Sequence, residues 1–479
     1  MTKSIRYYFG KGVSKTLSGV LKVLPTGGKS LPGLFFIKLS GWDSVKELSE
    51  NQVEKGSILI TGTNGKTTTT TMMIDLFSID SKLSSSVGNN TVFALTTSLL
   101  DNPGEIGVFE YGIRDIKHGL PDTVSTYINP KCVVYTNISR EHTQVAGVKN
   151  PFEDYLKAKT LLSKAVKDGM IITNADDPNT TYIGLNKEKD NNHIIYYGFN
   201  LESLNDIFDG ATVKCPKCGK QLEYSKYYMN QRGLYSCTCG FKRPKPDVEL
   251  TRFEEQDGKW LIQIKGNTYN YQTKENIPID TTFKVPPFGI HNLYNILCAV
   301  TTYASFTPVP ENIEENVTNY YNNLKMEILP PGRFEIIPFE GKTVGVGQGD
   351  NGDALKVNLL LMNSYIDDTL EFIYTTPDAN EEEIFEDHKD AIEKLNPNKL
   401  VVLPGRTSIE AAQEYYNQIQ EEFTSEFYPL EFDFETRINK IIDLVRKSDC
   451  KYVIITGCGE EIDLWEGIKK KLKKWIWFS

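Results

Sequence analysis

The segment TGTNGKTTTT, residues 61–70, constrains the fold most strongly, because it requires a strand before it and a helix after it. The run SILITGT, residues 57–63, is apolar and β-branched, which is typical of a buried parallel strand. A helix is predicted to begin near Lys66, after a turn formed by Gly62 and Gly65. Backbone N–H groups at such a helix start favour anions. The sequence therefore predicts a phosphate-binding loop on an α/β sheet.

The side chains of this loop suit a nucleotide with magnesium. Gly65 allows the backbone to approach phosphate closely, Lys66 can reach the β- and γ-phosphate oxygens, and the Thr67 hydroxyl can ligate Mg²⁺. The full Walker spacing would need glycine where Ile60 stands, so the loop is a shortened form. The alternative is a strand–turn–helix junction that needs glycine only for its turn, and the Gly-Lys-Thr-Thr order favours phosphate binding.

Two to four domains are expected, because 479 residues exceed the usual size of one core. Strand-like runs recur at EIGVFEYG, KCVVYTNIS and GMIITNADDP, which predicts a doubly wound central sheet. Four more, KTVGVGQGD, LEFIYTT, KLVVLPG and KYVIITGCG, predict a second α/β domain. We expect an N-terminal region at 1–50, a central domain at 51–330 with an insertion at 209–247, and a C-terminal domain at 331–479.

Composition limits the partners and the cellular location that the sequence predicts. The net charge of −10 argues against a general polyanion-binding surface, so no nucleic-acid partner is expected. No stretch approaches the roughly 20 apolar residues that span a bilayer, and the basic residues scattered through the first residues make a poor signal peptide. These features predict a cytoplasmic protein.

The N-terminal region reads as an amphipathic helix followed by the connector PTGGKSLPG. Its basic side chains stand among apolar ones, and the tail KKKLKKWIWFS is basic and aromatic. Such patterns can lie on anionic membranes. We favour the commoner arrangement, a solvated charged face with the apolar stripe packed on the domain, and peripheral membrane contact is the alternative. The basic residues of the helix are Lys3, Arg6, Lys11, Lys15 and Lys22.

Four of the eight cysteines cluster within the insertion, as CPKC, then eighteen residues, then CTC. Two close thiolate pairs suit one tetrahedral Zn²⁺, and the absence of histidine indicates a closed structural site. One alternative is a set of unrelated reduced cysteines. Another is a zinc ribbon that binds nucleic acid, which the acidic balance disfavours. The predicted zinc ligands are Cys215, Cys218, Cys237 and Cys239.

Several motifs, in this order along the chain, resemble the Mur ligase family, whose shortened loop reads like TGTNGKTT. The resemblance implies that Mg²⁺ is bound by Thr67, by Glu110 in FEYG and by His142 in TNISREH. Glu141 stands where the family usually has aspartate. In DYLKAKTLL, Lys159 matches a lysine that many members carry as a carbamate, which would hold a second magnesium. An ordinary exposed helical lysine is the alternative for Lys159.

The resemblance also implies ATP-binding residues. The motif TNADDP resembles the family's turn after a strand, and GIHNLYN places Asn292 and Asn295 near the adenine. The linker PPGRFE opens the C-terminal domain and implies that Arg333 contacts ATP phosphate. The segment GQGDNGDAL departs from the family pattern, which leaves open how the ribose and the amine are held. The implied loop contacts are Gly62, Thr63, Asn64, Gly65, Lys66, Thr67 and Thr68.

Family chemistry implies an ATP-dependent ligase in which Lys66 and magnesium neutralise the triphosphate while a substrate carboxylate forms an acyl phosphate. An amine then attacks, giving an amide. The cysteine insertion and the short N-terminal region resemble two branches. One is the archaeal pseudomurein peptide ligases, which add an amino acid to a nucleotide-linked wall peptide. The other is the MurT branch, which amidates a lipid-linked wall-peptide glutamate together with a glutaminase.

Two departures favour the peptide ligases. MurT-like chains have an altered segment where DYLKAK is intact here, and they supply an aspartate from a tryptophan-rich strand end. The corresponding LEFIYTTPDANEEE lacks tryptophan, although Asp378 keeps the MurT interpretation open. A noncatalytic protein that keeps the nucleotide fold is a third hypothesis, and Lys66, Glu110 and His142 speak against it. Folate ligases of the superfamily are a further alternative that the cysteine insertion does not suit.

Overall fold

The computed structural model describes residues 5–22, 29–88, 91–113, 115–139, 151–202, 213–229, 231–325, 332–363, 365–405, 408–431, 433–458 and 462–474. Two compact units divide the chain, and the division falls between the described residues that end at 325 and those that begin at 332. Each unit is an α/β structure with a large, mostly parallel sheet. The multidomain α/β class predicted from the sequence is confirmed.

The first unit is built on a nine-stranded sheet of order β11-β10-β9-β6-β5-β4-β1-β3-β2, with a separate β7–β8 hairpin. Its strands are β1 (Ser57–Thr61), β2 (Leu83–Ser86), β3 (Ile106–Glu110), β4 (Cys132–Tyr135), β5 (Met170–Asn174), β6 (His193–Phe199), β7 (Glu223–Met229), β8 (Arg232–Ser236), β9 (Val248–Gln256), β10 (Lys259–Tyr269) and β11 (Asn276–Val285). Its helices are α1 (Ile5–Leu21), α2 (Leu31–Ser40), α3 (Asp43–Gln52), α4 (Lys66–Asp80), α5 (Val92–Asp101), α6 (Ile116–Gly119), α7 (Pro121–Ile128), α8 (Pro151–Leu161), α9 (Pro178–Lys187), α10 (Asn292–Phe306) and α11 (Ile313–Asn322).

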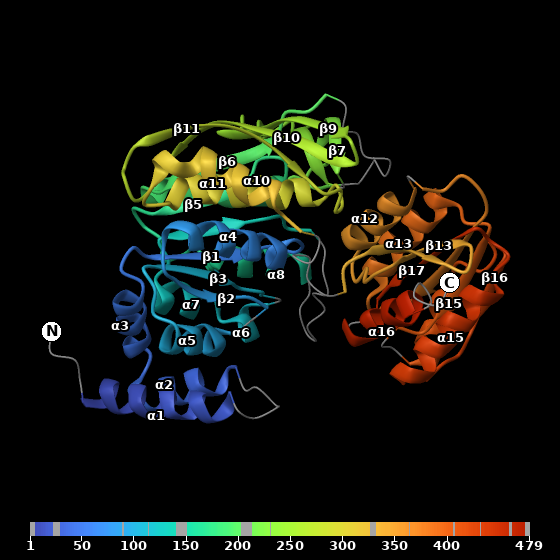
Figure 1. Ribbon diagram of the computed structural model, residues 1–479, viewed down its shortest axis with the longest axis horizontal. Helices are drawn as coiled ribbons and strands as arrows, with labels where there is room; N and C mark the ends of the chain where they lie inside the picture. Colours follow the sequence, from blue (N-terminus) through green and yellow to red (C-terminus); the bar gives the residue numbers. More distant parts are fainter. Residues whose placement is uncertain are drawn as a thin grey trace. The chain divides into compact units, whose positions relative to one another are not determined.

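The strands β1 to β6 run parallel. The sequence predicted β1, β3, β4 and β5, which are fully buried, mostly apolar runs, but not β2 or β6. In Figure 1, α4 and α10 lie side by side above β1 and β3, and α5 and α7 lie below them. The strands β9, β10 and β11 extend the sheet, with β9 parallel to β6 and both later pairs antiparallel. This extension is not among the sequence predictions.

The N-terminal helices pack on the same unit as the central sheet. Tyr7 of α1, Phe36 of α2 and Leu48 of α3 are buried in one apolar cluster with Leu95 of α5. The helix α2 already begins within the segment that the sequence analysis assigns to a connector, because Pro32 suits the first turn of a helix. None of the described helices is long and apolar enough to cross a membrane.

The second unit has a six-stranded sheet of order β12-β13-β17-β14-β15-β16, parallel except for the β12–β13 pair. Two apolar clusters lie in this unit, and the four strands predicted from the sequence are present. Its strands are β12 (Glu335–Phe339), β13 (Lys342–Val346), β14 (Leu370–Thr375), β15 (Lys399–Leu403), β16 (Ser425–Phe427) and β17 (Tyr452–Gly457). Its helices are α12 (Gly352–Asn363), α13 (Glu382–Leu395), α14 (Ile409–Asn417), α15 (Phe434–Lys447) and α16 (Ile462–Lys473).

Candidate functional site

The glycine loop joins β1 to α4 at the carboxyl ends of the parallel strands. Gly65 caps α4 in the left-handed conformation, with φ of 81°, and Gly62 has φ of 153°. A Cβ atom on Gly62 would stand 1.9 Å from the Thr136 Oγ1 atom. Both positions therefore need glycine, which tightens the turn and leaves the first amides of α4 aimed out of the helix end. This is the geometry of an anion site.

Groups that could hold a cation adjoin this loop. The Lys66 Nζ atom donates a hydrogen bond to the Thr63 carbonyl at 2.6 Å, so the amine folds back across the loop. The Thr67 hydroxyl donates to the Glu110 Oε1 atom at 2.9 Å, and Glu110 Oε2 accepts from the Gly88 amide at 2.7 Å. Glu110 is 3% exposed, at the end of β3 beside β1. The hydroxyl and the carboxylate present the adjacent hard oxygen ligands that Mg²⁺ binds.

Asn137 holds the glycine loop in place, a role that the sequence analysis did not predict. Its Oδ1 atom accepts from the Asn64 amide at 3.1 Å, and its Nδ2 atom donates to the Asn64 carbonyl at 2.9 Å. The Thr136 hydroxyl also donates to that carbonyl at 2.8 Å, and the Thr63 amide donates to the Asn137 carbonyl at 2.8 Å. Both residues lie in TNIS, directly after β4, where a polar pair that ends a buried strand was the available signal.

Lys159 lies at the base of the loop and is completely buried. Its Nζ atom donates to the Thr61 hydroxyl at 3.0 Å and to the Gly62 carbonyl at 3.1 Å. The ammonium group lies 4.9 Å from the centre of the Tyr155 ring, whose hydroxyl is 3.0 Å from the Thr63 hydroxyl. The alternative of an ordinary exposed lysine is therefore wrong, and the carbamate stays a prediction.

Asn292 and Asn295 reach the same loop from α10. The Asn295 Oδ1 atom accepts from the Thr69 hydroxyl at 3.1 Å, and its Nδ2 atom donates to Asn292 Oδ1 at 2.7 Å. The Asn292 Nδ2 atom in turn donates to the Phe288 carbonyl at 2.6 Å. Both side chains are buried, so they support α4 from within the unit. The contact with adenine that the family resemblance implies stays a prediction.

The TNADDP turn is buried, and Asp177 organises it. One of its oxygens accepts from the amides of Asn179 and Thr180 and caps α9. The other accepts from the Ile138 amide at 3.2 Å and from the Gln231 Nε2 atom at 2.7 Å. Burial raises the pKa of Asp177 to about 6, against the effect of these donors. This carboxylate therefore fixes the turn that supports the end of β4.

Three sequence-predicted residues and one departed segment complete the comparison with the sequence analysis. His142 and Glu141 lie outside the described residues. Arg333 is exposed in the second unit, directly before β12. In the departed segment GQGDNGDAL, the Asn351 side chain accepts from the Ala354 amide at 3.0 Å and so caps the start of α12. Within the described part of the first unit, the structure brings together Lys66, Thr67, Glu110, Lys159, Asn292 and Asn295.

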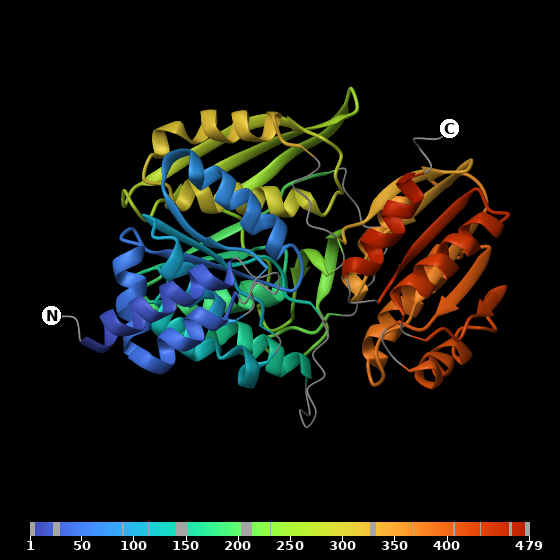
Figure 2. The same cartoon turned by 60° about the horizontal axis from the view of Figure 1, so that its bottom comes forward.

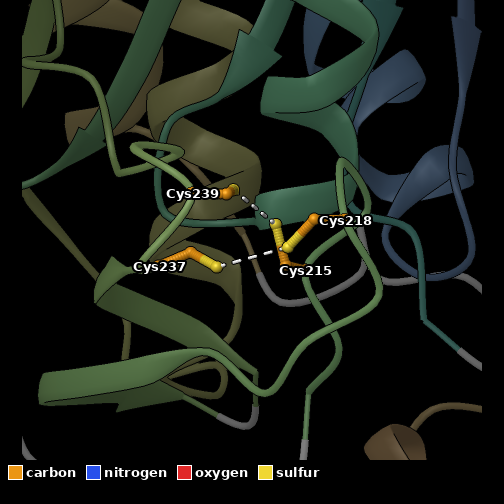
Figure 3. Close-up of side chains that lie close together, drawn as sticks. All are labelled: Cys215, Cys218, Cys237 and Cys239. Atoms are coloured by element: carbon orange, nitrogen blue, oxygen red, sulfur yellow. Dashed lines mark hydrogen bonds between the residues drawn. The ribbon is translucent and has the colours of Figure 1, made fainter.

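The four clustered cysteines converge, as Figure 3 shows. All four sulfur atoms lie within 4.8 Å of one another, with Cys215 and Cys239 3.7 Å apart and Cys218 and Cys237 3.6 Å apart. Sulfur atoms around one tetrahedral zinc lie about 3.8 Å apart, since each Zn–S bond is about 2.3 Å. A disulfide, at about 2.05 Å, would be much shorter. The donor set and its spacing fit a structural Zn²⁺ ion.

The cysteine insertion is tied to the central sheet through Arg243 and Asp176. The Arg243 Nε atom lies 2.6 Å from Asp176 Oδ1, and the Arg243 guanidinium also donates to the Phe199 carbonyl at 2.7 Å. Burial raises the pKa of the Asp176 carboxyl, while the Arg243 charge lowers it. The Tyr235 hydroxyl of β8 donates to the Ala175 carbonyl at 3.0 Å. The insertion therefore packs against the end of β5, next to the Asp177 turn.

Comparison with known proteins agrees with this architecture. The family described as Mur ligase middle domain matches residues 60–234. The MurT subunit of lipid II isoglutaminyl synthase from Staphylococcus aureus is 27% identical over 259 residues, covering 51% of this chain and 56% of that protein. The chain thus spans about half the length of the curated relatives it matches.

Solved structures share the fold over most of the chain. A pseudomurein peptide ligase type C from Methanothermus fervidus has a TM-score of 0.67 at 22% identity, covering 90% of this chain and 81% of that one. MurF from Thermotoga maritima, solved with ADP, has a TM-score of 0.53 at 16% identity, covering 90% and 84%. The fold and the glycine loop define an α/β protein with an anion-binding geometry at the start of α4. Residues 60–234 match the Mur ligase middle domain, within a fold that the chain shares with solved Mur-type ligases.

Proposed function

We propose that the chain is an ATP-dependent ligase that joins a carboxylate to an amine, with release of ADP and phosphate. The observation that carries this proposal is the hydrogen bond between the Thr67 hydroxyl and the Glu110 carboxylate, directly beside Lys66 and the first turn of α4. An anion site and a cation site thus adjoin at one sheet edge. That combination suits a metal-bound triphosphate. The curated relative is a subunit of a synthase, and the two solved relatives are ligases.

The residues of this site have separate tasks. The amides of the glycine loop and the first turn of α4 bind the phosphate chain, and Lys66 turns from the Thr63 carbonyl toward the β- and γ-phosphates. Thr67 and Glu110, with His142 from the family resemblance, would hold Mg²⁺, which would supply neutralisation of the charge on the transferred phosphoryl group. A substrate carboxylate oxygen bonds to the γ-phosphorus and ADP leaves. The amine then attacks the acyl carbon, loses a proton, and displaces phosphate.

The substrate assigned to this reaction is an amino acid that is added to a nucleotide-linked wall-peptide precursor of the pseudomurein type. Two observations support the assignment. Lys159 is buried beside the glycine loop, where its carbamate would hold a second magnesium. The segment DYLKAK that contains it is intact here, whereas the MurT branch has an altered segment at this place. The solved pseudomurein ligase also shares the fold over 90% of the chain. Carbamylated Lys159 is part of this proposal.

A second candidate is a MurT-like synthetase subunit that amidates a wall-peptide glutamate with ammonia from a glutaminase. The curated MurT relatives favour it. Asp378 lies just past the carboxyl end of β14. Its backbone amide donates to Glu381 Oε2 at 2.9 Å, and its carbonyl accepts from the Tyr415 hydroxyl at 2.9 Å. A partner glutaminase would then supply the amine. A cytoplasmic location suits both candidates.

One experiment separates these candidates. Purified protein is given ATP, Mg²⁺ and a pool of wall-peptide precursors, and phosphate release is measured with single amino acids and with ammonium. We expect release stimulated by one amino acid and lost in Lys66→Ala. Stimulation by ammonium alone would move the assignment to the amidating branch. Absence of release with every amine would contradict ligase activity and favour a noncatalytic binding protein.

A further inference from the structure

An ordinary amphipathic helix buries its apolar stripe, but the fully buried side chains of α1 are mostly small. The residues of α1 that face the rest of the unit are Tyr7, Gly10, Ser14 and Ser18, a stripe at helical spacing made mostly of small side chains. A Cβ atom on Gly10 would stand 1.9 Å from the Ser40 Oγ atom, so α1 and α2 approach closely along this stripe. The approach at Gly10 therefore requires a small residue, while Tyr7 at the start of the stripe packs edge-on against Phe36 of α2, with ring centres 5.9 Å apart.

Several large apolar side chains of α1 lie on a different face, whereas Leu17 and Leu21 are partly buried. Ile5, Phe9, Val13 and Val20 share one face, and they are 89%, 62%, 37% and 56% exposed. The sequence analysis expected this apolar stripe to pack on the domain, and that expectation is wrong. Small residues provide the close contact with α2, so the apolar stripe is turned to the outside.

The exposed apolar surface continues onto α2. Leu31, Phe35 and Leu39, spaced four residues apart, are 37%, 41% and 37% exposed, and Tyr8 of α1 adds 59%. Together the two helices carry eight of the twelve large apolar residues that are exposed in the described part of the chain. Figure 2 shows α1 and α2, in dark blue, at the near side of the first unit. We call this surface the N-terminal apolar face.

The charged side chains of α1 and α2 themselves are all basic. The first 40 residues contain seven Lys and Arg and no Asp or Glu, although the whole chain has a net charge of −10. Arg6, Lys15, Lys29 and Lys38 are exposed. Lys22 is also exposed and lies 3.0 Å from the carboxylate of Asp101. A basic border around exposed apolar side chains is complementary to anionic headgroups over a hydrocarbon layer.

We propose that the N-terminal apolar face docks on an anionic lipid bilayer. The apolar side chains of α1 and α2 enter the boundary between headgroups and acyl chains, and the basic side chains contact anionic headgroups. A second copy of the chain is a poorer occupant, since pairing two such faces would bring like charges together. Docking is separate from ligase chemistry. It would hold the first unit, with its nucleotide site, at a membrane surface.

Co-sedimentation of the full chain with vesicles tests this proposal without requiring turnover. Vesicles of phosphatidylcholine alone are compared with vesicles of equal parts phosphatidylcholine and phosphatidylglycerol, at low and high salt. We expect binding to the anionic vesicles only, weakened by salt because the basic side chains are exposed. Equal binding to both vesicle types, or binding to neither, would overturn the proposal.

Paired variants assign the binding to this face. Phe9→Gln with Val20→Gln removes apolar contact, and Lys15→Glu with Lys38→Glu reverses charge. Each pair should weaken vesicle binding by about tenfold or more. Circular dichroism and phosphate release check that the variants are folded, because none of these residues belongs to the nucleotide site. Unchanged binding in either pair would contradict the proposal.

The matched controls change similar side chains elsewhere. Ile79→Gln with Ile462→Gln removes two apolar side chains that are 50% and 47% exposed, and Lys167→Glu with Lys189→Glu reverses two exposed charges. Both controls should bind the anionic vesicles like the unchanged protein. Sedimentation velocity tests whether a second copy of the chain occupies this face instead. A dimer that disappears in the Phe9 and Val20 pair, together with no vesicle binding, would identify the face as an interface between copies and overturn the proposal.

Discussion

The Asn295 Oδ1 atom lies 2.3 Å from the position that a Cβ atom on Gly65 would occupy. Gly65 has a left-handed backbone, and Asn295 also accepts a hydrogen bond from the Thr69 hydroxyl one turn into α4. Two motifs that are far apart in the sequence thus meet at the start of α4. Their contact fixes where the phosphate-binding amides of this helix point.

Gly65→Ala should therefore weaken nucleotide binding. A left-handed alanine costs about 1–2 kcal/mol, and its methyl group would also displace Asn295. We expect the affinity for a nonhydrolysable ATP analogue to fall at least about tenfold in calorimetric titration. The matched control is Gly258→Ala, where φ is 69° but nothing lies within 4 Å of the added carbon.

The double variant Gly65→Ala with Asn295→Ala isolates the steric part of this effect. Removing the Asn295 amide relieves the contact with the new methyl group, so the two changes should be less than additive in binding free energy. Additive losses would contradict a direct contact between these residues.

Glu110→Gln should separate nucleotide binding from catalysis. Glutamine keeps the size of the side chain and one oxygen, but it removes the charge that a magnesium ion would meet beside Thr67. We expect turnover to fall by about 100-fold, corresponding to the loss of several kcal/mol of charge stabilisation. Nucleotide affinity measured without Mg²⁺ should stay nearly unchanged. A turnover that keeps its magnesium dependence would exclude Glu110 as a ligand.

Lys159→Ala should lower both stability and turnover. The buried amine donates to Thr61 and to the Gly62 carbonyl, and losing these hydrogen bonds at a buried site costs about 1–3 kcal/mol of unfolding free energy. The control Lys157→Ala changes an exposed lysine on the same helix and should have little effect on either quantity. The carbamate is tested with ¹³C-labelled bicarbonate by NMR, where its resonance should vanish in Lys159→Ala only. A missing resonance in the unchanged protein would show an unmodified lysine.

Removal of metal from the cysteine cluster should destabilise the first unit. The four sulfur atoms are spaced to share one ion, and a structural zinc contributes directly to folding free energy. We expect one zinc per chain by elemental analysis, lost in Cys237→Ser with a clear fall in melting temperature. The control Cys450→Ser changes a cysteine that is not a member of the cluster. Full stability without bound metal would contradict the zinc assignment.

Local patterns made much of this predictable. The strands β1, β3, β4 and β5 are short, buried, mostly apolar runs, which a local window of sequence reveals. The glycine loop is recognised from the order of its own residues in TGTNGKTTTT. The extension β9 to β11 was missed, although β10 alternates buried and exposed side chains and Asp257-Gly258 joins β9 to β10 as a two-residue hairpin turn. Only the parallel pairing of β9 with β6, which adds this extension to the central sheet, depends on contacts beyond a local window. The orientation of α1 was wrong for a related reason. Which face is buried depends on the close fit with α2, and composition does not contain that information.

The least predictable feature is the support of the glycine loop by the hairpin of β7 and β8. The Gln231 Nε2 atom donates to the Ile138 carbonyl and to Asp177 Oδ2, both at 2.7 Å. Ile138 directly follows Asn137, which holds Asn64 of the loop through two hydrogen bonds. Through the Gln231 side chain, the cysteine insertion therefore contacts the segment that holds the glycine loop in place.

Gln231→Ala should loosen the glycine loop without abolishing turnover. Losing a hydrogen bond that leaves the buried Asp177 oxygen short of a donor costs about 1–3 kcal/mol, part of which falls on the position of Asn137. We expect KM for ATP to rise by about threefold to tenfold while kcat changes little, with faster amide exchange in residues 61–68. The control Gln263→Ala removes a glutamine whose amide contacts Asp280 on the antiparallel extension. Equal KM values in both variants would mean that the hairpin does not support the loop.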